Sequence, residues 1–178
     1  MSPVAAFDRR VDDALERWRG TRVADRLFVV ASEVGDFSVA WHLIGAVRGL
    51  TSDARADQAF VFSALIAVES VVVNQGLKRL FRRRRPTVAG DPRLTVRRPS
   101  TSSFPSGHAS AAFFAATLLT GWSGLWWAPA WFLLATIIAT SRAYVRIHHP
   151  SDVVAGAVVG LALGLGARAA LDAFTSFG

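Results

Sequence analysis

Four segments of this sequence are apolar over lengths close to the length that crosses a lipid bilayer. They cover residues 58–77, about 108–122, about 125–140 and 152 to about 170. A membrane-spanning helix needs roughly 20 predominantly apolar residues. The composition agrees, because 52% of the residues are hydrophobic and only 19% are charged, whereas about a quarter of the residues are charged in soluble domains. The sequence therefore predicts an integral membrane protein.

The region before residue 51 contains two shorter apolar segments, 22–34 and 37–50. A helix of about 13 residues is ~20 Å long, which is less than the ~30 Å hydrocarbon core of a bilayer. We expect tilted or partly interfacial helices here, joined by a turn at Gly35-Asp36.

The N-terminal segment, residues 4–19, places apolar side chains at helical spacing among charged ones: Val4, Phe7, Val11, Ala14, Leu15 and Trp18. This pattern favours an amphipathic helix on the membrane surface, and a solvated helix is the open alternative. The mixed charges do not fit a cleavable signal peptide. The predicted fold is an all-α polytopic membrane bundle of about six helices, the first two short, preceded by an amphipathic interfacial helix in residues 1–20. Residues 1–178 form one domain, with the main bundle in 58–170.

Two further patterns indicate how the helices are arranged. Tryptophan favours the head-group level of a bilayer, and three tryptophans lie beside the turn at 121–124: Trp122, Trp126 and Trp127. This turn then marks one membrane face, and the polar stretches 78–107 and 141–151 share the opposite face. Small residues every four positions let helices pack closely, and the last apolar segment has such a series: Gly156, Gly160 and Gly164.

Composition also excludes several classes of site and partner. The chain has no cysteine, so disulfides, iron–sulfur clusters and thiolate zinc sites are excluded. The net charge is +7, but the basic residues flank apolar segments. Anionic lipid head groups are therefore the expected partners, and nucleic acid is not. The sequence leaves the oligomeric state open.

Unusual polar residues occur at every helix junction of the second membrane face. They are Lys78, Arg85-Pro86, Pro105-Ser106-Gly107-His108, Ser141-Arg142, His148 and Asp152. These residues become neighbours if the helices form an antiparallel bundle. Because arginine can hold a phosphate through two parallel hydrogen bonds, the three cations Lys78, Arg85 and Arg142 favour an anionic ligand. The turn at Ser106-Gly107 adds free backbone N–H groups at a helix start, which is a ready anion site, and Gly107 lets the backbone approach the ligand closely.

The two histidines of this face suggest acid–base and nucleophilic chemistry. His148 and Asp152 are four residues apart, so the carboxylate can hold one ring nitrogen and leave the other free to attack. His108 is a second titratable group that can protonate a leaving oxygen.

Together these residues form a pattern in three parts, Lys78-x6-Arg85-Pro86, Pro105-Ser106-Gly107-His108 and Ser141-Arg142-x5-His148-x3-Asp152. The pattern resembles the signature of the type 2 phosphatidic acid phosphatase superfamily, which includes lipid phosphate phosphatases, bacterial acid phosphatases and vanadium haloperoxidases. The resemblance covers about residues 58–170.

The resemblance implies a role for each matching residue. His148 is the expected nucleophile that forms a phosphohistidine, Asp152 its orienting carboxylate, and His108 the general acid. The expected phosphate-binding residues are Lys78, Arg85, Ser106, Gly107 and Arg142. No metal and no cofactor are expected. The implied activity is hydrolysis of a membrane lipid phosphate, with a polyprenyl phosphate or diphosphate favoured over a phospholipid phosphate.

Two other functions stay open at this point. A vanadate-dependent haloperoxidase would use the same pocket, although such relatives are usually larger and soluble. A non-enzymatic polybasic scaffold would recruit anionic lipid through the run 82–85. We interpret Arg82, Arg83 and Arg84 as membrane-flanking anchors, and Glu69 as a structural carboxylate that faces the bundle interior.

The side of the membrane on which the site lies is left open by the charges. Eleven of the 20 Lys and Arg residues lie on the face with the polar junctions, and nine lie elsewhere. Three of the eleven are assigned to phosphate binding, which leaves eight against nine. The tendency of basic residues to lie on the cytoplasmic side of the membrane therefore does not decide the orientation. A multi-pass protein of the cell membrane is expected in either case.

Overall fold

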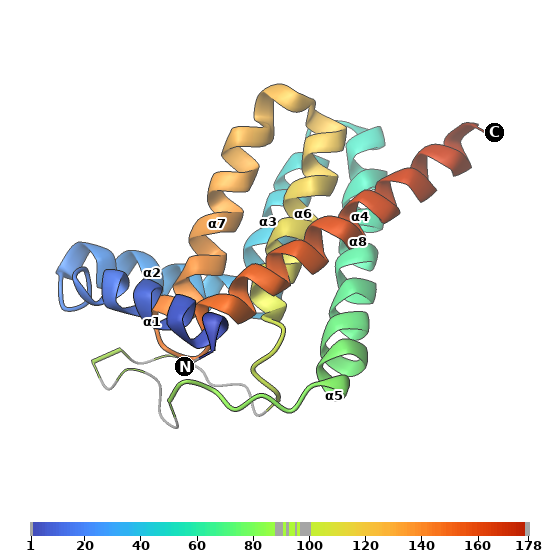
Figure 1. Cartoon of the computed structure of the whole chain (residues 1–178). Helices are drawn as coiled ribbons and strands as arrows, with labels where there is room; N and C mark the ends of the chain where they lie inside the picture. Colours follow the sequence, from blue (N-terminus) through green and yellow to red (C-terminus); the bar gives the residue numbers. More distant parts are fainter. Residues whose placement is uncertain (1, 88–90, 92, 95, 97–100, 177–178) are drawn as a thin grey trace.

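The computed structural model describes residues 2–87, 91, 93–94, 96 and 101–176, and every regular element in these ranges is helical (Figure 1). An N-terminal helix, α1, covers Pro3–Glu16. The longer helices that follow are α2 (Arg22–Gly35), α3 (Val39–Gly49), α4 (Asp53–Val71), α6 (Gly107–Ser123), α7 (Ala128–Tyr144) and α8 (Pro150–Ser176). The predicted all-α fold with six helices, the first two short, is confirmed.

Helix α6 forms the centre of the bundle and packs against α4, α7 and α8. Its inward positions are small, and four alanines have no solvent exposure: Ala109, Ala112, Ala115 and Ala116. Helix α8 crosses α6 closely, and the glycines leave the space for this. A β-carbon at Gly156 would overlap the carbonyl oxygen of Ser106, the N-cap residue of α6, and one at Gly160 would overlap that of Ser110. The predicted glycine face is therefore the contact surface between these two helices.

Helices α2 and α3 are separated by a sharp bend. Phe37 and Ser38 have positive φ angles of 52° and 57° within the short 3-10 helix η1, Asp36–Ser38. Helix α3 runs beside α4, whereas α2 lies crosswise at the end of the bundle where α6 and α8 begin (Figure 1). This arrangement agrees with the predicted short helices joined at Gly35-Asp36, and it places the turn beside the start of α6.

The helix that begins as α4 continues past Val71 with a different winding. The π-helix η2, Val72–Leu77, follows α4 and leads into the short α5, Lys78–Leu80. A π-turn adds a residue to the helical turn and often occurs at functional sites. Here it lies between Glu69 and Lys78, which both line the same cavity.

Three helical stretches in the described part of the chain are long and apolar enough to cross a membrane: Arg22–Gly49, Asp53–Leu80 and Pro150–Phe174. The first of them contains the bend between α2 and α3. Helices α6 and α7 have 17 residues each, or ~26 Å at 1.5 Å per residue, and pack against these stretches. The chain is a multi-pass membrane protein.

The turn between α6 and α7 lies at the end of the bundle opposite to the start of α8 (Figure 1). The short 3-10 helix η3, Leu125–Trp127, forms part of it. Trp126 is 92% exposed and Trp127 is 53% exposed, which suits the predicted position of these side chains at the head-group level.

Helix α1 turns a row of acidic side chains toward the rest of the protein. Asp8 is buried, whereas Val4 and Phe7 are exposed, and the helix packs against α7 and α8. The acidic side chains of that inward face recur every four residues and pair with arginines of other segments: Asp8 with Arg83, Asp12 with Arg146 and Glu16 with Arg93. The outward apolar side chains favour the interfacial alternative over a fully solvated helix.

Candidate active site

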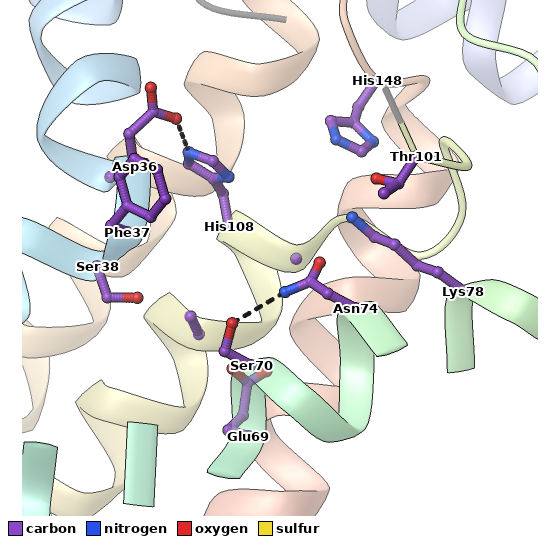
Figure 2. A pocket seen from close by; sticks show the side chains of 13 residues that line it. Asp36, Phe37, Ser38, Glu69, Ser70, Asn74, Lys78, Thr101, His108 and His148 are labelled. Atoms are coloured by element: carbon purple, nitrogen blue, oxygen red, sulfur yellow. Dashed lines mark hydrogen bonds and ion pairs between the residues drawn. The ribbon is translucent and has the colours of Figure 1, made fainter. Parts of the chain in front are cut away.

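A cavity of about 250 Å³ opens at the end of the bundle where α6 and α8 begin. His108 and His148 both line it, from opposite sides (Figure 2). The turn between α2 and α3 forms one wall and the segment from Glu69 to Lys78 forms another, and Gly107 at the start of α6 also lines the cavity. Four of the predicted site residues line this cavity: Lys78, Gly107, His108 and His148. Arg85 and Asp152 contact His148, and Arg142 lies beside Asp36, so these three lie next to the lining residues.

His148 lies in the connection between α7 and α8, with its ring buried. Its Nε2 is 3.1 Å from Nη1 of Arg85. Because a guanidinium only donates hydrogen bonds, Nε2 accepts this bond and the ring proton belongs on Nδ1. Burial lowers the pKa of His148 to about 3, so the imidazole is neutral at physiological pH and has a lone pair on Nε2.

Asp152 lies on the Nδ1 side of this ring, as its spacing of four residues predicts. The distance from Nδ1 to Oδ2 is 3.7 Å, so the carboxylate faces the ring at slightly more than hydrogen-bond length. Asp152 is fully buried, and its oxygens accept hydrogen bonds from the hydroxyl of Ser103, from the backbone N–H of His149 at 2.9 Å and from Nη1 of Arg83 at 2.5 Å.

His108, in the first turn of α6, has a carboxylate partner that the sequence analysis did not identify. Its Nε2 is 2.7 Å from Oδ1 of Asp36 (Figure 2). The second ring nitrogen, Nδ1, points away from Asp36, toward the side on which His148 lies. The signal for Asp36 was present only as part of a predicted turn, because its partner lies 72 residues away in sequence.

The three predicted cations lie around the two histidines. Lys78 is buried and lines the cavity. Arg85 donates to the carbonyl oxygens of Ile147 and Thr101 at 2.8 and 3.0 Å as well as to His148. These contacts hold the guanidinium beside Nε2 of His148, where a phosphate would lie during attack.

Arg142, at the end of α7, has no solvent exposure. Its Nη1 donates to the carbonyl oxygen and hydroxyl of Ser32 and lies 3.9 Å from Oδ1 of Asp36. Its Nε and Nη2 have no hydrogen-bond partner among the described residues. Buried guanidinium groups are normally fully hydrogen-bonded, so these two donors are suited to an anion that binds next to them.

The start of α6 contributes backbone groups to the same place. The hydroxyl of Ser106 caps the helix by accepting from the backbone N–H of Ala109 at 3.5 Å. Gly107 lines the cavity, and a β-carbon there would lie 2.7 Å from Oδ1 of Asn74. A side chain here would displace the end of the Asn74 side chain and reduce the space in the cavity. The first N–H groups of a helix have no acceptor within the helix and are available to an anion.

Two interpretations of charged residues have different outcomes. Glu69 is buried and accepts a hydrogen bond from the hydroxyl of Ser110, so its predicted inward orientation is confirmed. The interpretation of Arg83 as a membrane anchor is wrong, because its guanidinium points into the protein and binds both Asp8 and Asp152. Arg82 and Arg84 are exposed, as an anchor requires.

Two further points concern charge and metal binding. Arg97 and Arg98, which contributed to the charge count of this face, lie outside the described residues. In the part of the chain that the structure describes, no group of three His, Cys, Asp or Glu side chains could hold a metal ion.

A membrane-embedded helical bundle with a polar, histidine-lined cavity at one end is the arrangement of an integral membrane enzyme. The family model described as the PAP2 superfamily matches residues 59–175, and the chain belongs to this family. The predicted family and enzyme class, a phosphate-ester hydrolase, are thereby confirmed.

The chain is similar to several phosphatases over more than half of its length. It is 38% identical over 127 residues to decaprenylphosphoryl-5-phosphoribose phosphatase of Mycolicibacterium smegmatis, which covers 70% of this chain and 67% of the relative. The protein of the same name from Mycobacterium tuberculosis is 33% identical over 135 residues, which is 75% of this chain and 72% of the relative. A putative undecaprenyl-diphosphatase of Escherichia coli, YbjG, is 30% identical over 104 residues, which is 58% of this chain and 52% of the relative.

Solved structures show the same fold. The transmembrane PAP2-type phosphatidylglycerolphosphate phosphatase of Bacillus subtilis superposes with a TM-score of 0.73 at 19% identity, covering 97% of this chain and 87% of that structure. LpxE of Aquifex aeolicus superposes with a TM-score of 0.71 at 24% identity, covering 93% of this chain and 94% of that structure.

Proposed function

We propose that this protein removes a phosphate from a polyprenyl lipid phosphate or diphosphate, through a phosphohistidine on His148 and without a metal ion. The observation that carries the proposal is that the rings of His108 and His148 line one cavity (Figure 2), near two buried donors of Arg142 that have no hydrogen-bond partner among the described residues. Residues 1–178 act as one domain in this proposal, because α1 packs against α7 and α8.

In the first step Nη1 of Arg85 transfers its hydrogen bond from Nε2 of His148 to a phosphate oxygen, and the freed lone pair on Nε2 attacks phosphorus. The N–P bond forms while the bond from phosphorus to the leaving oxygen breaks, and protonated His108 gives its Nδ1 proton to that oxygen. Asp152 faces the Nδ1 proton of His148 at 3.7 Å and stabilises the positive charge that develops on the ring.

In the second step the same groups act in reverse. The neutral His108 accepts a proton from a water molecule, and the water oxygen attacks phosphorus. The N–P bond then breaks, so inorganic phosphate is released, His148 regains its lone pair and His108 is again protonated. Burial lowers the pKa of His108 to about 4. Asp36, 2.7 Å from its Nε2, holds the ring in place and acts against this lowering, and the negative charge of a bound phosphate acts in the same direction as Asp36 to favour the protonated form in the first step.

The charge on the transferred phosphoryl group is stabilised by the protein itself. Lys78, Arg85 and Arg142 supply three positive charges around the cavity, and the first turn of α6 adds oriented N–H groups. Preorganised cations and N–H donors of this kind supply much of the stabilisation in phosphoryl transfer. We therefore expect hydrolysis to proceed in the presence of a chelator.

A polyprenyl substrate is supported by the relatives and by the position of the cavity. Three relatives with 30–38% identity are named as phosphatases of polyprenyl-linked compounds, and another, 37% identical over a shorter stretch of 68 residues, is named as a lipid A 1-phosphatase. The cavity lies at the end of helices that cross the membrane, so a phosphate can enter it while a long apolar tail stays between lipids. A lipid substrate is therefore favoured over a soluble phosphate ester.

The scaffold alternative is not supported by the packing of the run 82–85. Arg83 and Arg85 bind carboxylate, histidine and carbonyl groups inside the protein, so only Arg82 and Arg84 are exposed to recruit lipid. The haloperoxidase alternative has no specific support, and halide oxidation that appears only when vanadate is added would revive it.

The test is a substrate panel with detergent-solubilised protein in EDTA. The panel contains a polyprenyl monophosphate, a polyprenyl diphosphate, a polyprenyl-phosphoryl sugar phosphate, phosphatidic acid and phosphatidylglycerol phosphate, and released inorganic phosphate is measured. We expect release from at least one polyprenyl compound at a higher kcat/KM than from either phospholipid. His148→Ala is expected to abolish release and His108→Ala to slow it severely. Full activity of His148→Ala, or loss of wild-type activity in EDTA, would contradict the proposal.

A further inference from the structure

Asp8 is a buried carboxylate on the N-terminal helix, outside the three-part pattern that marks the active site. Only 7% of its surface is exposed. It lies far in sequence from its partners, 75 residues before Arg83 and 143 residues before Ser151. A buried carboxylate is costly unless it is paired and hydrogen-bonded, so the contacts of Asp8 show what holds it in this position.

Asp8 binds two elements of the active site at once. Its Oδ2 accepts from Nη2 of Arg83 at 2.7 Å. Its Oδ1 accepts from the backbone N–H of Ser151 at 2.8 Å, and Oδ2 accepts from the hydroxyl of Ser151 at 2.9 Å. Ser151 is in the first turn of α8, where an anion is favoured by the helix dipole and by free N–H groups. Asp8 therefore caps α8 from a different helix.

Arg83 continues the chain of contacts to the catalytic carboxylate. Its Nη1 lies 2.5 Å from Oδ1 of Asp152 and 2.7 Å from the hydroxyl of Ser151. One guanidinium thus bridges two buried carboxylates, Asp8 through Nη2 and Asp152 through Nη1. The other oxygen of Asp152 is the one that faces His148.

We propose that Asp8 is a positioning residue for hydrolysis, acting through Arg83 and the first turn of α8 to hold Asp152 against His148. This inference rests on the proposed function, because it assigns Asp152 the task of orienting the nucleophile. An arginine side chain has many rotamers, and losing that freedom costs free energy. With both ends of its guanidinium bound to carboxylates, Arg83 keeps one geometry and so fixes the position of Oδ1 of Asp152.

The neighbouring carboxylate on α1 provides a matched control. Asp12 lies one helical turn after Asp8 on the same inward face and pairs with Arg19 at 2.6 Å and with Arg146 at 3.1 Å. The pairs of Asp12 help to dock α1 but do not include Asp152 or its partners. Asp12→Asn therefore removes ion pairs of α1 that do not reach Asp152, although one of them is made with Arg146, two residues before His148.

The experiment measures kcat and KM for phosphate release with the full-length protein. Asp8→Asn keeps an oxygen for the N–H of Ser151 but removes the charge that holds Arg83. We expect kcat to fall about 10- to 100-fold, as for other groups that orient a reacting residue, with KM changed less than about twofold. Asp12→Asn is expected to lower kcat less than about threefold. His148→Ala releases no phosphate if the proposed function is correct, whatever the result for Asp8.

A double-mutant cycle separates positioning from general destabilisation. Arg83→Gln is expected to lower kcat as much as Asp8→Asn does. The kcat of the double variant should lie within about threefold of the kcat of Arg83→Gln, because coupled residues give non-additive effects. Arg83→Lys keeps the charge but cannot bridge both carboxylates, so it is expected to lower kcat even if Asp8→Asn does not fold. Wild-type kcat in Asp8→Asn, wild-type kcat in Arg83→Lys, or effects that multiply in the double variant would overturn the proposal.

Discussion

Asp36 and His108 are joined by a hydrogen bond of 2.7 Å between Oδ1 and Nε2, which connects the bend after α2 to the first turn of α6. The bend owes its shape to the positive φ angles of Phe37 and Ser38, and these direct Asp36 into the cavity rather than along either helix. The general acid and the nucleophile of the proposed reaction therefore each face a carboxylate, Asp36 for His108 and Asp152 for His148.

Replacing Asp36 by asparagine is expected to slow hydrolysis most for substrates that need a proton on the leaving oxygen. Without the carboxylate, protonated His108 is less favoured and less well oriented, so kcat/KM for a lipid phosphate should fall about 10- to 100-fold. The loss of kcat/KM, which does not include release of the phosphohistidine, should be smaller for nitrophenyl phosphate, whose leaving group needs no proton. Asp53→Asn, at an exposed position in the first turn of α4, is the control. An equal loss for both substrates would contradict the role of Asp36.

The buried, neutral state of His148 predicts how stability depends on pH. Its pKa is about 3 in the folded protein and about 6.5 in an unfolded chain. Between these values the unfolded state binds the proton and the folded state does not, so acid favours unfolding. At pH 5 this group should lower the free energy of unfolding by at most about 2 kcal/mol relative to pH 7.

The measurement for this pH effect compares thermal unfolding in detergent at pH 7 and pH 5. Wild-type Tm should fall more between these two pH values than the Tm of His148→Asn, whose side chain does not titrate. The carboxylates are shared by both proteins, so their contribution cancels in the comparison. Equal falls in Tm would show that His148 is not held neutral by burial.

The helices at the centre of the bundle could be predicted from the sequence because their signals are local. The predicted segment 108–122 corresponds to Gly107–Ser123, and 152–170 lies within Pro150–Ser176. The residues of the site were predicted for the same reason, since each belongs to a short pattern at a helix end. Their meeting around one cavity follows from antiparallel packing of the helices.

The carboxylates and the arginine that support the site had no comparable signal. Asp36 lies 72 residues from its partner, and Arg83 lies 69 residues from Asp152. A pairing over such distances depends on the tertiary fold and leaves no local spacing. Helix α1 does carry a local signal, which the sequence analysis did not use. Its acidic residues recur every four positions, at Asp8, Asp12 and Glu16, and so lie on one face of a helix.

Gly160 is expected to be essential for packing of α8 on α6. A methyl group there would overlap the carbonyl oxygen of Ser110, so Gly160→Ala should destabilise the protein by about 1–3 kcal/mol, as overpacking does. Gly166 is the matched control on the same helix, because nothing lies within 4 Å of its added β-carbon. Gly166→Ala should leave Tm unchanged or raise it slightly. A lower Tm for Gly166→Ala than for Gly160→Ala would contradict the observed packing.

The account depends most directly on a covalent bond between phosphorus and His148. Incubating the protein with a substrate labelled in its terminal phosphate, stopping the reaction in alkali and mapping the labelled peptide tests for this bond. His108→Ala with nitrophenyl phosphate is the most favourable sample, because the leaving group needs no proton while release of the intermediate needs His108. The account predicts a phosphohistidine at His148 that is absent from His148→Ala. Label on another residue, or unchanged labelling of His148→Ala, would contradict it.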